Sequence, residues 1–251
     1  MLMTNADMSI REHHPLKGEK DFRWRGDQPT RVEALSDMVF AFALTLLVVS
    51  SDPPQSFADL TEQLWGFPGF AAAFTILLLI WNSHYFYFRR YALEDGWTTT
   101  LNAALLFLIL FFVYPLKYLA TMLSRFVQSV AEGAPSPPFS FDEARVALVI
   151  FSLAYALVFL MFALFYAHAR RRADALELNA GERRLTRFSF WQQMVHVFVG
   201  LAVVAAASIA PQRIAPMMGG LYFLIGPLMF VVGAMTTPRP AKTRPAPMPQ
   251  S

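Results

Sequence analysis

The chain has 251 residues, of which 55% are hydrophobic and only 16% are charged. Soluble domains carry about 25% charged residues, so this composition excludes one ordinary soluble core and favours a membrane protein. The chain contains no cysteine, which excludes disulfides, thiolate metal sites and cysteine nucleophiles. The first 30 residues are polar and lack the apolar core of a signal peptide.

The apolar residues cluster into runs that are long enough to cross a membrane. A bilayer core of about 30 Å requires about 20 helical residues. The sequence therefore predicts an all-α polytopic membrane protein with six spans, at residues 31–50, 66–88, 101–124, 144–168, 190–210 and 214–235. We expect residues 1–30 to form a polar cytoplasmic segment, residues 31–235 the six-helix membrane domain, and residues 236–251 a disordered, basic, proline-rich tail.

The basic residues are distributed unevenly between the two sides of this arrangement. Seventeen of the 21 Lys and Arg lie before or at the start of the first span, after the second, between the fourth and fifth, or in the tail. Cytoplasmic loops carry such an excess, so both termini are expected in the cytoplasm, with the chain crossing the cell membrane several times. The basic residues thus indicate topology, and no nucleic-acid partner is predicted.

The first span begins with polar residues. Thr30 followed by Glu33 fits a helix-capping box, with Arg31 at the first helical position. A helix over residues 31–50 is about 30 Å long, so it just crosses the membrane and must include its polar start. Asp37 then lies about 9 Å inside the helix start, where an ionised carboxylate needs partners or water.

Partners for this carboxylate are predicted by depth. The second span returns to the cytoplasmic side, where it carries Trp81 and His84, and the third span starts there with Asn102. Together with Ser36 and Asp37 they can form one polar layer of hydrogen-bond donors and acceptors. This layer is either structural glue between three helices or part of an ion or proton path.

Three motifs in this layer resemble the transmembrane protein 175 potassium-channel family. They are R-V-E-A-L-S-D with the apolar run after it, W-N-S-H at 81–84, and L-N-A-A-L-L-F-L at 101–108. The resemblance implies a channel that conducts potassium in preference to sodium, with potassium as the permeant ion and no cofactor. Since the chain holds one copy of the first motif, the resemblance implies the prokaryotic, homotetrameric type.

The resemblance also implies roles for individual residues. The first helix of each subunit would line the pore, with Phe42, Thr45 and Val49 toward the ions and Phe42 at a hydrophobic constriction. The family usually has Leu or Ile at the position of Phe42, and Leu35 replaces the Phe of its first motif. The motif and bracing residues would be Arg31, Ser36, Asp37, Trp81, His84 and Asn102.

Two other functions remain open at this point. One is a proton-coupled or proton-conducting transporter that uses Asp37 and His84, although no internal repeat typical of such transporters is visible. The other is a non-conducting membrane scaffold in which the Phe42 side chains seal the axis. An enzyme is not predicted, because the sequence shows no paired-histidine metal motif and no phosphate-binding glycine loop.

Overall fold

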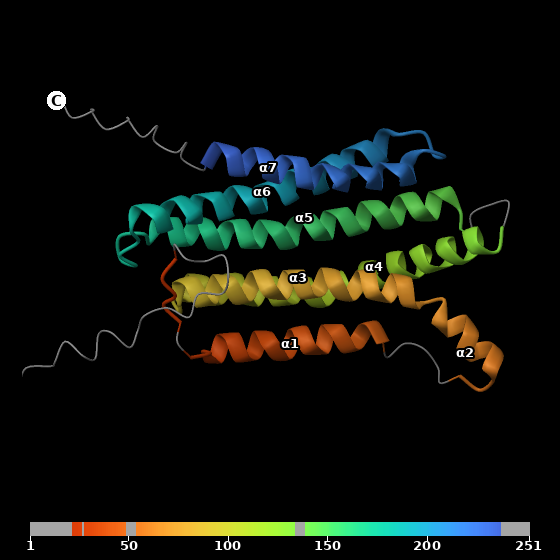
Figure 1. Cartoon of the computed structure of the whole chain (residues 1–251), viewed down its shortest axis with the longest axis horizontal. Coiled ribbons are helices and arrows are strands. Elements are labelled where there is room, and N and C mark those ends of the chain that lie inside the picture. Colours follow the sequence, from red (N-terminus) through yellow and green to blue (C-terminus); the bar gives the residue numbers. More distant parts are fainter. Residues whose placement is uncertain (1–21, 27, 49–53, 134–138, 237–251) are drawn as a thin grey trace, which may run out of the picture.

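The computed structural model describes residues 22–26, 28–48, 54–133 and 139–236, and within these ranges it is all helical. Residues 237–251 of the predicted tail at 236–251, and most of the polar segment at 1–30, lie outside the described residues. Figure 1 shows the long helices lying side by side and nearly parallel. The elements are α1 (Arg31–Val48), α2 (Phe57–Leu64), α3 (Phe67–Tyr91), α4 (Gly96–Ala131), α5 (Phe141–Arg171), α6 (Ala180–Ile209), the 3₁₀ helix η1 (Ala215–Leu224) and α7 (Ile225–Thr236).

Five stretches of the described chain are long and apolar enough to cross a membrane. They are α3, α4, α5, α6 and the continuous stretch Ala215–Met235 formed by η1 and α7. Helix α1, the first predicted span, is not among them, because its 18 residues include the three charged residues Arg31, Glu33 and Asp37. The all-α class is therefore confirmed. The sixth predicted span corresponds to α1, which its length and composition alone do not assign to the membrane.

The helix ends differ from the predicted ends for local reasons. Helices α5 and α6 begin earlier than expected, because Ser140 and Asn179 each form a capping box with a glutamate three residues later. Helix α2 was not predicted; it is a short amphipathic helix that Ser56 caps and that has no buried residue. The last predicted span begins as 3₁₀ helix and contains Gly219 and Gly220, which weaken an α-helix.

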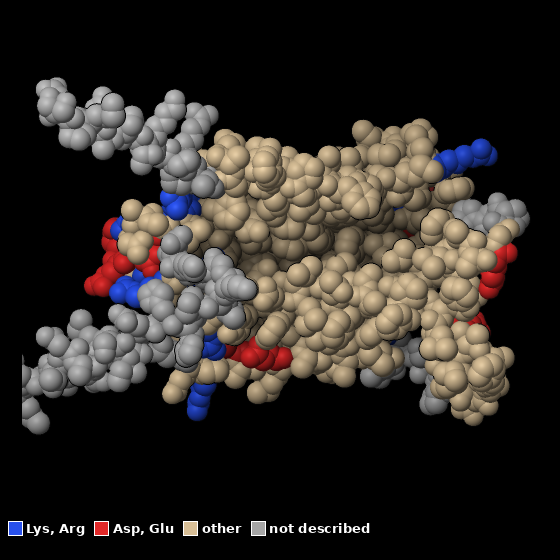
Figure 2. Space-filling model, viewed as in Figure 1, with Lys and Arg blue, Asp and Glu red and all other residues tan. Residues whose placement is uncertain are grey.

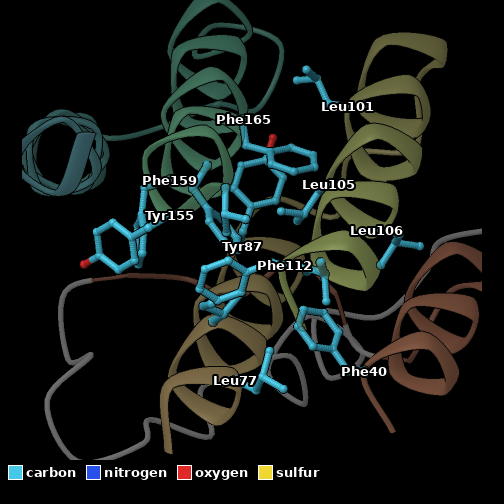
Figure 3. Packing of buried hydrophobic residues seen from close by; sticks show 14 of the residues in the cluster. Phe40, Leu77, Tyr87, Leu101, Leu105, Leu106, Phe112, Tyr155, Phe159 and Phe165 are labelled. Atoms are coloured by element: carbon cyan, nitrogen blue, oxygen red, sulfur yellow. The ribbon is translucent and has the colours of Figure 1, made fainter. Parts of the chain in front are cut away.

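The bundle is built by successive packing of neighbouring helices. Helix α5 packs against α4 and α6, α3 packs against α4, and α1 packs against α3 and α4 at the edge of the bundle. Aromatic side chains fill the centre, where Tyr87 of α3 contacts Phe165 of α5 with ring centroids 4.7 Å apart (Figure 3). Phe40 of α1 joins this core from the edge and lies 5.7 Å from the ring of His84.

Charged residues lie mostly at the two ends of the bundle. Figure 2 shows an uncharged middle, with Lys, Arg, Asp and Glu concentrated toward the ends of this face. At the end where α3 and α5 finish and α6 begins, Arg25 pairs with Glu182 at 3.0 Å, and Arg172 pairs with Asp95 at 3.3 Å. An apolar middle between charged ends is the surface expected of a bundle embedded in lipid.

A glycine allows close packing of α3 on α4. A Cβ built at Gly69 would lie 1.9 Å from the carbonyl oxygen of Ala120, so the two backbones approach as only glycine permits. Ser124 uses this proximity, because its hydroxyl oxygen accepts a hydrogen bond of 2.9 Å from the Gly69 amide. That amide is in the first turn of α3 and has no partner within the helix.

We expect Gly69→Ala to destabilise the protein by about 1–3 kcal/mol, because the helices must separate to admit the methyl group. Thermal melting of the purified protein in detergent, followed by size-exclusion chromatography, measures this loss as a lower midpoint. Gly96→Ala is the matched control, since a Cβ at Gly96 meets no atom within 4 Å. Equal midpoints for the two variants would contradict the close packing at Gly69.

Candidate functional site

The first turn of α1 is fixed by hydrogen bonds and an ion pair. The predicted capping box is confirmed, with the Glu33 amide 3.2 Å from the Thr30 hydroxyl and the Thr30 amide 2.8 Å from the Glu33 carboxylate. The other Glu33 oxygen pairs with Arg89 of α3 at 3.2 Å, and both side chains are buried. Arg89 was not predicted as a partner of Glu33, because it follows an apolar run and indicated only topology.

Three of the predicted site residues form one buried hydrogen-bonded group. Asn102 of α4 donates from Nδ2 to the Ser36 hydroxyl of α1 at 3.0 Å, and that hydroxyl lies 2.8 Å from the carbonyl of Val32. His84 of α3 places Nε2 2.9 Å from Oδ1 of the same Asn102. All three side chains are at most 2% exposed. The group therefore joins α1, α3 and α4 at one depth.

Asp37 is bonded by one of the three donors that depth predicted for it. The Trp81 indole donates from Nε1 to Oδ1 of Asp37 at 2.8 Å, and the Trp81 ring stacks on Tyr85 with centroids 5.8 Å apart. Asp37 lies on the exposed side of α1. The other two predicted donors, His84 and Asn102, bond to each other. Figure 3 shows α1 beside α3 and α4 in this region.

The opposite face of α1 is open. Phe42 is 56% exposed, and Thr45 is also exposed, whereas Phe40, Ala43 and Leu47 are buried against the bundle. Within each face the residues recur at spacings of three or four, which is how residues on one side of a helix are spaced. The exposed face is nevertheless apolar, because Leu35, Met38 and Val48 lie on it together with Phe42.

Three predicted residues of α1, Val49, Arg31 and Thr45, lie outside the buried hydrogen-bonded group. Val49 lies outside the described residues. Arg31 is exposed at the first residue of the helix, away from the buried group of Ser36 and Asn102. Thr45 donates its hydroxyl back to the helix, with the carbonyl oxygens of Ala41 and Phe42 at 2.8 and 2.9 Å. This bond leaves the lone pairs of the Thr45 oxygen available on the open face.

A second electrostatic contact stabilises the same end of the bundle. Asp95 caps α4 by accepting from the Thr98 amide at 2.9 Å, and it also lies 2.7 Å from His168 of α5. Partial burial favours the neutral acid, but the bonds from Thr98 and the nearby His168 lower the pKa of Asp95 to about 2. Asp95 is therefore ionised at neutral pH and ties α4 to α5.

The described residues show no metal centre. Within these ranges no three His, Asp or Glu side chains gather as ligands for a metal ion. The chemistry of the site is hydrogen bonding that attaches one face of α1, combined with an apolar face that carries one hydroxyl. Such a helix can line a shared axis when several copies associate through its open face.

The site motifs match a known protein family. A family model described as the endosomal/lysosomal potassium channel TMEM175 matches residues 31–112, which hold α1, α3 and the first half of α4. A protein named as a potassium channel in Marivirga tractuosa is 35% identical over 225 residues, covering 86% of this chain and 91% of that protein. A potassium channel of Streptomyces collinus is 29% identical over 189 residues, covering 70% and 83% respectively.

Solved structures show the same arrangement of helices. The crystal structure of a variant of the potassium channel MtTMEM175, in complex with a nanobody fusion protein, superposes with a TM-score of 0.76 at 35% identity. It matches 86% of this chain and 97% of that chain. The structure of a lysosomal potassium-selective channel TMEM175 homologue from Chamaesiphon minutus gives a TM-score of 0.55 at 24% identity, which supports the fold.

Proposed function

Because this chain belongs to the TMEM175 potassium channel family, we propose that four copies assemble into a potassium-preferring channel whose pore is lined by α1. The family consists of ion channels, so the protein is a potassium channel of the membrane and not an enzyme. The proposal concerns what the family alone leaves open: the pore helix, its constriction, the subunit number and the orientation in the membrane.

The observation that carries the proposal is the contrast between the two faces of α1. One face is attached to α3 and α4 through the buried hydrogen bonds of Ser36, His84 and Asn102. The other face lies at the edge of the bundle and is mainly apolar around Phe42, with the Thr45 hydroxyl on it. A helix held from one side and open on the other is suited to face a symmetry axis, and charged residues are scarce on the open face.

The chemistry of the open face suggests how ions pass. Four Phe42 side chains at one level form a hydrophobic constriction, which restricts ions by excluding water. One turn further along, the Thr45 oxygen presents lone pairs because its proton is used by its own helix. A ring of such oxygens can replace part of the hydration shell of a potassium ion. Val49 continues this face in the sequence.

The orientation follows from the charges at the end where α1 begins. Arg25, Arg89, Arg90 and Arg172 lie at this end, together with residues 22–26 and the connection between α5 and α6. The positive-inside rule places this end in the cytoplasm, with α1 counted as the sixth span and both termini inside. In a prokaryotic cell the location is the plasma membrane.

Potassium and sodium flux into proteoliposomes that contain the purified protein tests this function. We expect uptake of potassium down its gradient to exceed that of sodium and to grow in proportion to the driving force. Flux that saturates and requires a proton gradient would instead indicate a transporter. Absence of flux from folded, oligomeric protein would indicate a scaffold. The transporter is disfavoured by the contacts, since Asp37 and His84 bond to Trp81 and Asn102 respectively.

A further inference from the structure

Both ends of α1 are contacted by cations from the helices on which it packs. At its first turn Glu33 pairs with Arg89 of α3. At its last turn the ammonium of Lys117, on α4, donates to the carbonyl oxygen of Leu46 at 3.2 Å. Neither contact belongs to the buried group of Ser36, His84 and Asn102. We call these two interactions the end contacts of α1.

The Arg89 guanidinium is held in place by three contacts. One guanidinium nitrogen lies 3.2 Å from the Glu33 carboxylate, and another donates to the carbonyl of Gly26 at 3.0 Å. The guanidinium also lies over the Tyr85 ring, 5.4 Å from its centroid. The backbone of Arg89 accepts from the amides of Arg25 and Gly26, so the segment before α1 is attached to the same residue. Arg89 thus fixes where α1 begins.

The Lys117 contact acts on the opposite end. The carbonyl of Leu46 lies in the last turn of α1 that the structure describes. The N-terminal end of a helix carries partial positive charge, so the Glu33 carboxylate in the first turn matches the dipole of α1. The Lys117 bond adds a polar contact near the other end of the described helix. Lys117 lies on α4 like Asn102, 15 residues further along that helix.

We propose that Arg89 and Lys117 are positioning residues that fix the rotation and height of α1, and thereby which of its side chains face the permeating ion. The hydrogen bonds of Ser36 and Asp37 lie within two turns of the helix start, and beyond them α1 is held by the apolar packing of Ala43 and Leu47. Apolar packing sets the rotation of a helix less sharply than directional bonds do, and the end contacts add such bonds at both ends. This inference rests on the proposed function for its effect on ions, while the rotation of α1 can be measured without any flux.

The test uses the absence of cysteine from the chain, which makes an introduced thiol unique. Thr45→Cys places the thiol on the open face, and Leu44→Cys places it one residue earlier, where the side chain packs partly against the core. The rate of modification by a water-soluble, charged thiol reagent is measured by mass spectrometry on protein in liposomes. We expect the thiol at position 45 to react several-fold faster than the thiol at position 44.

Arg89→Gln and Lys117→Met are each expected to reduce this ratio toward one and to lower potassium flux. Arg90→Gln and Arg125→Gln are the matched controls from the same two helices, and they are expected to preserve the ratio. A ratio that stays unchanged in both Arg89→Gln and Lys117→Met would overturn the inference. Loss of flux in every variant and in the unaltered protein would instead count against the proposed function alone.

Folding is checked by size-exclusion chromatography of each variant. Should Arg89→Gln lose its oligomer peak, Arg89→Lys supplies the measurement, because it keeps the cation and gives up the second bond to Gly26. We expect Arg89→Lys to give a ratio between those of the unaltered protein and the Lys117→Met variant. The charge-reversed pair of Glu33→Arg with Arg89→Glu is expected to recover more of the ratio than Arg89→Glu alone. Failure of both expectations would also overturn the inference.

Discussion

Phe42→Ala is expected to increase cation flux about tenfold and to reduce the preference for potassium, because removal of a barrier of about 1.4 kcal/mol accelerates a rate tenfold. The ring is 56% exposed on the open face of α1, where four copies would meet. Its replacement by a methyl group widens the constriction and admits water, which lowers the cost of passing a hydrated ion. Flux of potassium and of sodium into proteoliposomes measures both effects.

The matched control for this variant is Phe107→Ala. Phe107 is 71% exposed on α4, and the same atoms are removed without a change to α1. We expect its flux to equal that of the unaltered protein. An intermediate flux in Phe42→Leu, with a side chain of the kind that the family usually has there, would support steric control by the ring. Unchanged flux in Phe42→Ala would show that Phe42 faces lipid or another subunit and that the constriction lies elsewhere.

The sequence predicted the long helices α3 to α6 because each contains an apolar run bounded by charges or prolines. Arg89 and Arg90 mark the end of α3, and Arg170 to Arg172 mark the end of α5. Helix α2 was missed because eight amphipathic residues give too short a pattern to separate from a loop. Local turn chemistry was predictable at Thr30 and Glu33, since a capping box involves residues three positions apart.

The partners between helices were predicted less completely, and the reason is rotation. Depth in the membrane follows from counting residues, and it predicted that Ser36, Asp37, Trp81, His84 and Asn102 share one layer. Which side chains touch depends also on how each helix is turned about its own axis, and a single sequence does not fix this angle. Depth therefore left three candidate donors for Asp37, and the structure shows that Trp81 is the one that bonds it.

The same limitation applies to Arg89 and Lys117. Each could be explained locally, by topology or by the membrane surface, so neither pointed to α1. Their contacts join residues 56 and 71 positions apart in the chain, namely Glu33 with Arg89 and Leu46 with Lys117. Only the packing of α1 on α3 and α4 brings these residues together, and that packing follows from the buried face around Phe40.

Asn102→Leu is expected to lower stability strongly, because it removes the side chain that satisfies both Ser36 and His84. A buried polar group that loses its partner costs about 1–3 kcal/mol; His84 loses its bond to Asn102, whereas the Ser36 hydroxyl keeps its bond to the carbonyl of Val32. Thermal melting in detergent, with oligomer content measured by size-exclusion chromatography, follows this loss. Asn82→Leu makes the same chemical change at an exposed position of α3, and we expect it to leave the melting temperature nearly unchanged.

A compensated variant separates a packing role from a role in conduction. When all members of a buried hydrogen-bonded group are replaced by apolar side chains of similar shape, the stability change can be nearly neutral. Asn102→Leu combined with Ser36→Ala and His84→Phe is therefore expected to recover much of the lost stability. If potassium flux recovers with it, the group acts as structural glue that holds α1 in place. If stability recovers and flux or potassium preference does not, the polar atoms themselves contribute to ion passage, and their role extends beyond bracing the helix.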